Sequence, residues 1–231
     1  EIGKLAKAAG AEFIVYTAPI SLGLLEAPAN YGATICVGDL HGLGLHLNFG
    51  GGQAGFIASH DDMRYITEFK ELVDGMVETT VPGEQGYSVV LIERTHYAMR
   101  ENGKEFTGTQ NNLWTAPVAV YLSLMGPKGM EEIGHTIMTN AKYAAKKLAG
   151  IPGVSLRFPS VFFKEFVVNF DKTGKTVEEI NQQLLSRQIF GGVDLSRDYP
   201  ELGQSALYCV TETADKESID RLAGALQAIL N

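Results

Sequence analysis

The sequence predicts an α/β fold, in which a mixed β-sheet with helices on its faces is followed by a small α+β domain. The first observation is the order of patterns near the start of the chain, which runs helix, strand, connection, strand. This order is typical of a parallel or mixed sheet. The second is a long amphipathic pattern, after which short strands and helices alternate differently. We therefore expect residues 1–125 to belong to a large domain, and residues 126–231 to form a linking helix and a small domain.

The large domain begins with a helix over residues 2–9, which Gly10 ends in the manner of a C′ glycine. Apolar runs rich in β-branched and aromatic residues predict buried strands at 12–16, 33–37 and 54–58. The second of these, 33–37, reads as a strand that is covered on both faces. A short helical turn between prolines, over 19–28, connects the first two strands.

The end of the large domain is less regular. Residues 69–86 combine glycines and a proline with apolar residues, and we interpret them as a long surface excursion. Residues 87–92 read as a strand that runs into a helix over 93–100. An apolar helix follows at 113–125, and Pro127 suits the first turn of the next helix.

The small domain begins with that long helix, whose apolar stripe ends before Gly150. Strands are predicted at 154–158, 166–170 and 205–211. Thr176 and Glu179 form a capping-box pattern at the start of a helix over 176–187. A closing helix carries the apolar stripe Ile219, Leu222, Ala223, Leu226 and Ile229.

Composition excludes several classes of function. The net charge of −8 argues against general nucleic-acid binding, which needs a basic face. No apolar run approaches the roughly 18 residues that cross a bilayer. Cys36 and Cys209 both fall in predicted strands, so we interpret them as buried, reduced thiols in a cytoplasmic protein. The five histidines show no metal-ligand spacing, so no metal site is predicted.

A glycine-rich loop between the second and third predicted strands is the first candidate site. It holds six glycines between Gly42 and Gly55, three of them consecutive, at Gly50, Gly51 and Gly52. Glycines let a ligand or another chain approach backbone amides closely. His41 lies at its start, either as a functional side chain or as a loop histidine that hydrogen-bonds to the backbone.

A polar segment later in the chain is the second candidate. Glu93, Arg94, His96 and Arg100 recur at helical spacing and precede Thr107, Thr109 and Gln110. An arginine with threonine hydroxyls can receive a carboxylate or a phosphate. The same charged residues also fit a solvated helix face, and both interpretations stay open.

Two stretches resemble the first subunit, the α or N-terminal-half type, of the glycine cleavage system P protein family. They are YTAPISLGLLEAPANYGATICVGDLHGLGLHLNFGGGQAGFIAS and ERTHYAMRENGKEFTGTQNN. The strings SLGLL-x-x-P-x-x-YGA-x-x-x-VGD and FGG-x-x-x-GF are the most distinctive parts. The resemblance covers essentially the whole chain. It implies a fold-type I pyridoxal-phosphate (PLP) transferase-like structure, with the last part of the large domain followed by the small domain.

The resemblance also implies what this chain lacks. Enzymes of this fold hold PLP as a Schiff base on a lysine, which in the catalytic half of the family directly follows a histidine before the Gly-rich loop. Here His46 keeps the histidine and Leu47 stands at the lysine position, and no lysine occurs between Lys7 and Lys70. The strand at 12–16 also ends without the aspartate that pairs with the pyridinium nitrogen. No catalytic residue and no Schiff-base cofactor are therefore expected on this chain.

The implied function is that of a partner subunit in glycine decarboxylation, an oxidoreductase activity in which the remaining aminomethyl group passes to the lipoyl H protein. The resemblance implies a lysine-bearing β subunit that carries PLP, in an α2β2 assembly. Interface or site-lining residues are expected at His41, Gly50 to Gly52, Thr107, Thr109 and Gln110. Alone, the chain is expected to be inactive.

Two other functions stay open, namely an inactive PLP-fold binding or regulatory domain, and an independent PLP enzyme whose lysine lies elsewhere. The chain starts at Glu1 without an initiator methionine and enters a helix directly. We interpret it as part of a longer polypeptide. Without its N-terminal half, we expect exposed sheet surface and self-association.

Overall fold

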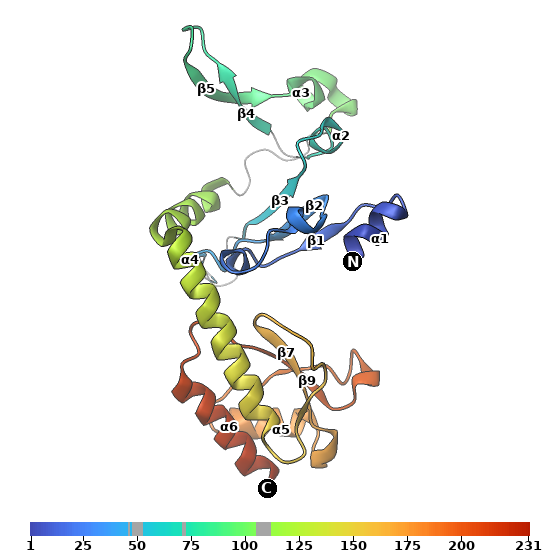
Figure 1. Ribbon diagram of the computed structural model, residues 1–231, viewed down its shortest axis with the longest axis vertical. Coiled ribbons are helices and arrows are strands. Elements are labelled where there is room, and N and C mark those ends of the chain that lie inside the picture. The colour runs from blue at the N-terminus through green and yellow to red at the C-terminus, as the bar shows by residue number, and fades with distance from the viewer. Residues whose placement is uncertain (46, 48–52, 71–72, 105–111) are drawn as a thin grey trace. The chain divides into compact units, whose positions relative to one another are not determined.

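The computed structural model describes residues 1–231 except 46, 48–52, 71–72 and 105–111. The chain divides into two compact units, Glu1–Gly126 (unit 1) and Pro127–Asn231 (unit 2). Figure 1 gives the element labels used below.

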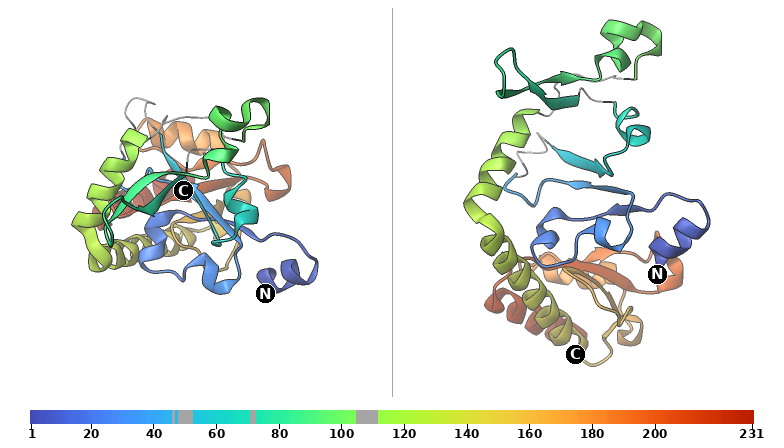
Figure 2. Two further views of the ribbon diagram at one scale, coloured as in Figure 1. Left: turned by 90° about the horizontal axis from the view of Figure 1, so that it is seen from above. Right: turned by 45° about the horizontal axis from the view of Figure 1, so that its top comes forward.

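Unit 1 contains the predicted mixed sheet, in the order β1-β2-β3. β1 (Ile14–Tyr16) and β2 (Ile35–Asp39) are parallel, and β3 (Gly55–Ser59) is antiparallel to β2. Figure 2 shows the three strands lying side by side. The predicted connection between the first two consists of two 3₁₀ turns, η1 (Pro19–Gly23) and η2 (Pro28–Tyr31).

Of two predictions for this part of unit 1, the end of the first helix is confirmed and the burial of the second strand is wrong. α1 (Ile2–Ala8) ends just before Gly10, whose φ of 66° confirms the predicted glycine terminus. By contrast, all five residues of β2 are only half-buried, so the expectation of a strand covered on both faces is wrong for this chain by itself.

The segment expected to be a surface excursion is mainly a β-hairpin. After α2 (Met63–Ile66), the strands β4 (Val73–Glu78) and β5 (Gln85–Val90) form a two-stranded antiparallel sheet. The helix predicted over 93–100 is also wrong. It is replaced by three short helical turns, because Thr95 and Arg100 within it, and Leu91 two residues before it, leave helical geometry. The turns are η4 (Ile92–Arg94), α3 (His96–Met99) and η5 (Arg100–Asn102), and the non-helical residues are Leu91 (φ 52°), Thr95 (ψ 159°) and Arg100 (φ 44°).

The long helix α4 (Asn112–Ala149) is interrupted at one residue. Gly126 has φ 58° and ψ −179°, which is not helical. The following Pro127 has no N–H to donate to the preceding turn. The two helices predicted on either side of this point are therefore both present, and the break coincides with the boundary between the units.

Unit 2 is an antiparallel sheet with helices, in the order β6-β7-β9-β8. Its strands are β6 (Ser155–Leu156), β7 (Glu165–Asn169), β8 (Val193–Asp194) and β9 (Ser205–Cys209), and its later helices are α5 (Val177–Leu185) and α6 (Lys216–Leu230). Short 3₁₀ turns lie at η6 (Asp171–Thr173) and η7 (Pro200–Leu202). β8 was not among the predicted strands, whereas the capping box of Thr176 and Glu179 at α5 is confirmed.

A continuous hydrophobic core lies inside unit 2. It joins the second part of α4 to both later helices and to the sheet, and includes Leu148, Val168, Phe170, Leu184 and Leu226, all fully buried. At its edge, Asp220 of α6 accepts a hydrogen bond from Tyr143 at 2.7 Å and forms ion pairs with Lys147 and Lys216. These cations and the hydroxyl hold the pKa of Asp220 well below its usual range.

Candidate functional site

The carboxyl ends of the parallel strands β1 and β2 bring two polar side chains together. Sites in α/β folds commonly lie at this edge of a sheet. The hydroxyl of Tyr16 donates a hydrogen bond to Asp39 Oδ2 at 2.6 Å. The end of the first strand has no aspartate, as expected from the sequence. The carboxylate lies instead at the end of the neighbouring strand, within reach of Tyr16.

His41, the first residue predicted to line a site, joins this pair. Its backbone N–H donates to Asp39 Oδ1 at 3.1 Å, and its ring Nδ1 lies 3.6 Å from the same oxygen. The carboxylate therefore faces a phenol on one side and an imidazole on the other. We call Tyr16, Asp39 and His41 the strand-end cluster.

A close approach of backbones holds the strand-end cluster in place. Thr17 N–H donates to Val37 O at 2.9 Å, which extends the pairing of β1 and β2 beyond Tyr16. A Cβ at Gly38 would lie 2.2 Å from the carbonyl oxygen of Thr17 and 2.6 Å from the ring of Phe56. Only glycine fits between these groups, and it lets the two strand ends lie close enough for Tyr16 to reach Asp39.

The remaining predicted site residues, Gly50, Gly51, Gly52, Thr107, Thr109 and Gln110, lie outside the described residues, as does His46. Leu47, at the position assigned to the lysine, is described and is solvent-exposed.

The second polar segment does not form one helix face. Arg94 is buried and donates a hydrogen bond from Nη1 to the carbonyl of Phe69, whereas Glu93, His96 and Arg100 are exposed. A solvated face is therefore the wrong interpretation for Arg94. This side-chain hydrogen bond ties Phe69, before the hairpin, to Arg94, after it, and the carbonyl of Arg94 accepts from Lys104 N–H at 2.8 Å.

The two cysteines differ in exposure. Cys36 is half-buried in β2, but Cys209 is exposed, so the prediction of two buried thiols is wrong for Cys209. Cys209 is the last residue of β9. Partial burial raises the pKa of both thiols, so neither is activated as a thiolate.

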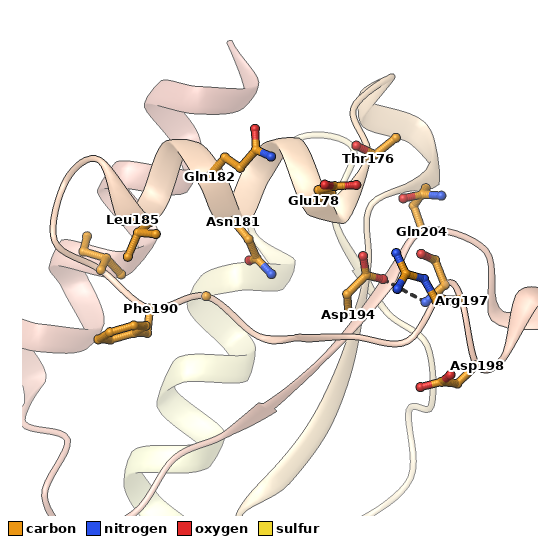
Figure 3. Close-up of a pocket in the computed structure, with 13 residues that line it drawn as sticks. Thr176, Glu178, Asn181, Gln182, Leu185, Phe190, Asp194, Arg197, Asp198 and Gln204 are labelled. Carbon is orange, nitrogen blue, oxygen red and sulfur yellow. Dashed lines mark hydrogen bonds between the residues drawn. The ribbon is translucent and has the colours of Figure 1, made fainter.

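Unit 2 has a hollow of about 690 Å³ between α5 and the segment that leads into and follows β8 (Figure 3). Leu185 and Phe190 form an apolar side, and Asp194, Arg197 and Gln204 form a polar side. Asp194 Oδ1 accepts the backbone N–H of Ser196 at 2.8 Å. This hollow was not predictable from the sequence, because the strand β8 beside it has two residues and gives no periodic pattern.

No cluster of three or more metal-ligating side chains occurs within the described residues. In that same part of the chain, no helix is long and apolar enough to cross a membrane.

Two solved structures of low sequence identity are similar to this chain in fold. A sphingosine-1-phosphate lyase from Burkholderia pseudomallei matches 99% of this chain and 47% of its own, at 17% identity and a TM-score of 0.63. A NifS-like protein from Rickettsia africae matches 99% of this chain and 56% of its own, at 16% identity and a TM-score of 0.64. The fold is that of the fold-type I PLP-dependent enzymes, which confirms the predicted fold class.

Closer relatives then define the family. The family model described as glycine cleavage system P-protein matches residues 1–226, so this chain belongs to that family. A crystal structure of glycine decarboxylase (P-protein) in inhibitor-bound form matches 99% of this chain and 51% of its own, at 30% identity and a TM-score of 0.87.

Curated relatives agree with this family. Probable glycine dehydrogenase (decarboxylating) subunit 1 of Desulfitobacterium hafniense is 38% identical over 99% of this chain and 50% of its own length. The protein with the same name from Pyrococcus furiosus is 36% identical over 100% of this chain and 50% of its own length. This chain therefore spans about half the length of the curated relatives that it matches.

The strand-end cluster does not fit a covalently held PLP. A Schiff base needs a lysine amine, and the cluster offers a phenol, a carboxylate and an imidazole. The sequence has no lysine between Lys7 and Lys70, a range that spans β1, β2 and the Gly-rich loop. The carboxylate also accepts hydrogen bonds from Tyr16 and from the backbone of His41.

Proposed function

We propose that this chain acts as the subunit of a glycine-decarboxylating enzyme that does not bear the Schiff-base lysine. The observation that carries the proposal is the combination of membership in the P-protein family with the absence of a lysine from the whole stretch between Lys7 and Lys70. The names of the curated relatives, glycine dehydrogenase (decarboxylating) subunit 1, support the same role.

In this proposal, PLP is bound by a second, lysine-bearing subunit in an α2β2 assembly. The whole enzyme releases CO2 from glycine and passes the remaining aminomethyl group to the lipoyl group of the H protein. The solved inhibitor-bound glycine decarboxylase supports the reaction class. This chain supplies structure and part of the site's surroundings, and works in the cytoplasm.

The strand-end cluster is the described part of that contribution. His41, held against Asp39, presents an imidazole at the edge of the sheet where this fold class places its sites. We propose that it orients a polar group of the neighbouring site by a hydrogen bond. Gly50 to Gly52, Thr107, Thr109 and Gln110 remain proposed contributors to the same surface.

The test is a reconstitution that counts labelled CO2 from carboxyl-labelled glycine. The full chain is mixed with PLP, H protein and the lysine-bearing subunit, and each protein is omitted in turn. We expect release only when both subunits are present, and no absorbance of a PLP–lysine imine from this chain with PLP alone. Release without this chain would instead favour an inactive binding or regulatory domain. An imine absorbance from this chain alone would favour an independent PLP enzyme.

A pair of histidine variants tests the role of the strand-end cluster. His41→Ala removes the imidazole beside Asp39, and we expect about a tenfold loss of CO2 release, since one lost hydrogen bond costs about 1 kcal/mol or more. His135→Ala is the matched control, because His135 is exposed on α4, where its ring Nε2 lies 3.9 Å from Glu131. Equal activity of the two variants would contradict a role for His41.

A further inference from the structure

The β4–β5 hairpin of unit 1 has two different faces. Successive side chains of a strand point to opposite sides, so the register places three cross-strand pairs on one face: Asp74 with Val89, Met76 with Tyr87, and Glu78 with Gln85. We call this the acidic ribbon face. On the other face, Val73, Val77 and Val90 are half-buried.

The centre of the acidic ribbon face is apolar and exposed. Tyr87 is 84% exposed, its partner Met76 is 63% exposed, and Val89 beside them is 41% exposed. A tyrosine paired with a methionine offers a large apolar contact area, and both residue types are enriched in protein–protein interfaces. This face therefore has the composition of an interface rather than of an ordinary solvated strand.

A third strand would stabilise the hairpin, and none joins it within the described residues. Its sheet has two strands only, and a two-stranded hairpin is marginally stable in water unless a third strand or another element packs on it. Contact with another molecule over the acidic ribbon face would supply that packing.

Charge decides what kind of molecule fits. Residues 73–90 contain Asp74, Glu78 and Glu84, and no lysine, arginine or histidine. Nucleic acids and anionic membranes would be repelled by this charge. A second copy of the chain, docked face to face, would place acid against acid. The kind of partner that remains compatible with this face is a protein surface with an apolar centre and a rim of lysine or arginine.

We propose that the acidic ribbon face docks such a basic-rimmed surface on the second subunit of the enzyme. This inference rests on the proposed function, which supplies the partner, and adds the place of contact. Met76 and Tyr87 act as the buried anchor, and Asp74 and Glu78 pair with the partner's basic rim. The contact both stabilises the hairpin and joins the subunits.

The first experiment measures the dissociation constant of the full chain and the second subunit by calorimetry. The double variant M76S/Y87S removes the apolar anchor, and we expect about 30-fold weaker binding, as for an interface hot spot. The matched control is Y97S/M99S, because Tyr97 and Met99 are the same residue types, are 85% and 46% exposed, and lie outside the hairpin on α3. We expect the control to bind like the wild type.

The charge swap D74K/E78K gives a second, independent readout. We expect weaker binding than wild type in dilute salt and a smaller loss of affinity on going to higher salt, because the ionic contribution is screened. E131K/E132K on α4 is the control of equal charge change. Photocrosslinking from benzoylphenylalanine at position 87 to the second subunit tests the contact directly, and decides the matter if M76S/Y87S fails to fold.

The outcomes separate this inference from the function on which it rests. If the wild-type chain binds the second subunit and the hairpin variants bind equally well, the contact lies elsewhere, and the inference is overturned while the proposed function stands. If the wild-type chain does not bind the second subunit at all, the proposed function is contradicted. The second subunit is then also excluded as the partner of the acidic ribbon face. A wild-type homodimer that M76S/Y87S dissociates would show a second copy on this face instead.

Discussion

The two units of the chain bury their apolar side chains to very different extents. Unit 2 encloses a continuous core in which Phe170, Ile180 and Leu226 are fully buried. In unit 1, every residue of the central strand β2 is half-buried, and its neighbour Tyr16 is exposed. Yet unit 1 carries both the strand-end cluster and the acidic ribbon face.

The well-packed core lies in one unit, and the proposed functional surfaces lie in the other. Burial of apolar area stabilises unit 2 through its own side chains, so its fold follows from residues that lie within it. In unit 1 the described residues leave sheet and hairpin surface open. We therefore expect partner contacts to add more to the stability of unit 1 than to that of unit 2.

The largest expected effect is in the core of unit 2. Phe170→Ala should lower the free energy of unfolding by about 3–5 kcal/mol, because it removes a fully buried ring and leaves a cavity. Phe190→Ala, at an exposed phenylalanine of the same unit, should change it by less than about 0.5 kcal/mol. Urea unfolding followed by circular dichroism measures both, and equal effects would show that the core is not where the structure puts it.

The next effect tests unit 1. Gly38→Ala should cost about 1–3 kcal/mol, because the new Cβ would lie 2.2 Å from the carbonyl oxygen of Thr17. Trp114 is the single tryptophan and lies in unit 1, so its fluorescence follows this transition. Gly224→Ala is the control, since its Cβ would meet nothing within 4 Å in a helix, where alanine should stabilise by about 0.5–1 kcal/mol. A harmless Gly38→Ala would contradict the close pairing of β1 and β2.

A smaller effect is expected at the start of α5. Thr176→Ala removes a side chain that accepts from Glu179 N–H, and should cost about 1 kcal/mol of unit 2 stability. Thr136→Ala is the comparison, because the Thr136 hydroxyl donates back to Glu132 O within α4, and losing this bond should be nearly neutral. The same urea titrations measure both. If the fluorescence of Trp114, in unit 1, does not respond to either change, the two units unfold independently of each other.

The smallest effect per group is acid sensitivity of unit 2. The side-chain hydroxyl and the backbone N–H of Ser218 hold the pKa of Asp215 below its usual value, and the Asn169 amide and Gln204 N–H do the same for Asp171. A lowered folded-state pKa stabilises above the unfolded value of about 3.9, and this stability is lost as pH falls through the lower folded value. Urea midpoints at pH 7 and pH 3 should therefore show a loss in acid.

Asp215→Asn provides the control for this pH dependence. The asparagine oxygen still accepts from Ser218 N–H but does not titrate. The variant should lose less stability in acid than the wild type, and an identical loss would rule out Asp215 as a contributor.

Much of the local structure was predictable because it depends on neighbours in sequence. Pro127 after Gly126 marked the break in α4, and the Thr176 and Glu179 pair marked the start of α5. The strand predicted at 87–92 overlaps β5, whereas β4 was missed because the glycines and the proline of residues 69–86 were interpreted as a surface excursion.

The candidate site was harder to predict because it depends on register. The contact of Tyr16 with Asp39 follows from the pairing of Tyr16 with Val37 in β1 and β2, which no local pattern gives. The buried position of Arg94 likewise depends on the distant carbonyl of Phe69. The missing lysine, by contrast, was visible in the sequence itself.

The backbone at Gly126 has a stereochemical consequence for the evolution of the chain. Its φ of 58° and ψ of −179° are the mirror image of the extended conformation that L-residues prefer, so a D-amino acid would suit this position best. A Cβ there would meet nothing within 4 Å, so no neighbouring atom could relax to accommodate a side chain. Every missense mutation in this codon introduces an L-residue, and L-residues disfavour this backbone conformation. Glycine is the one achiral residue that the genetic code encodes. Any substitution at this junction would therefore strain the backbone itself, and no mutation of a neighbouring side chain could relieve that strain.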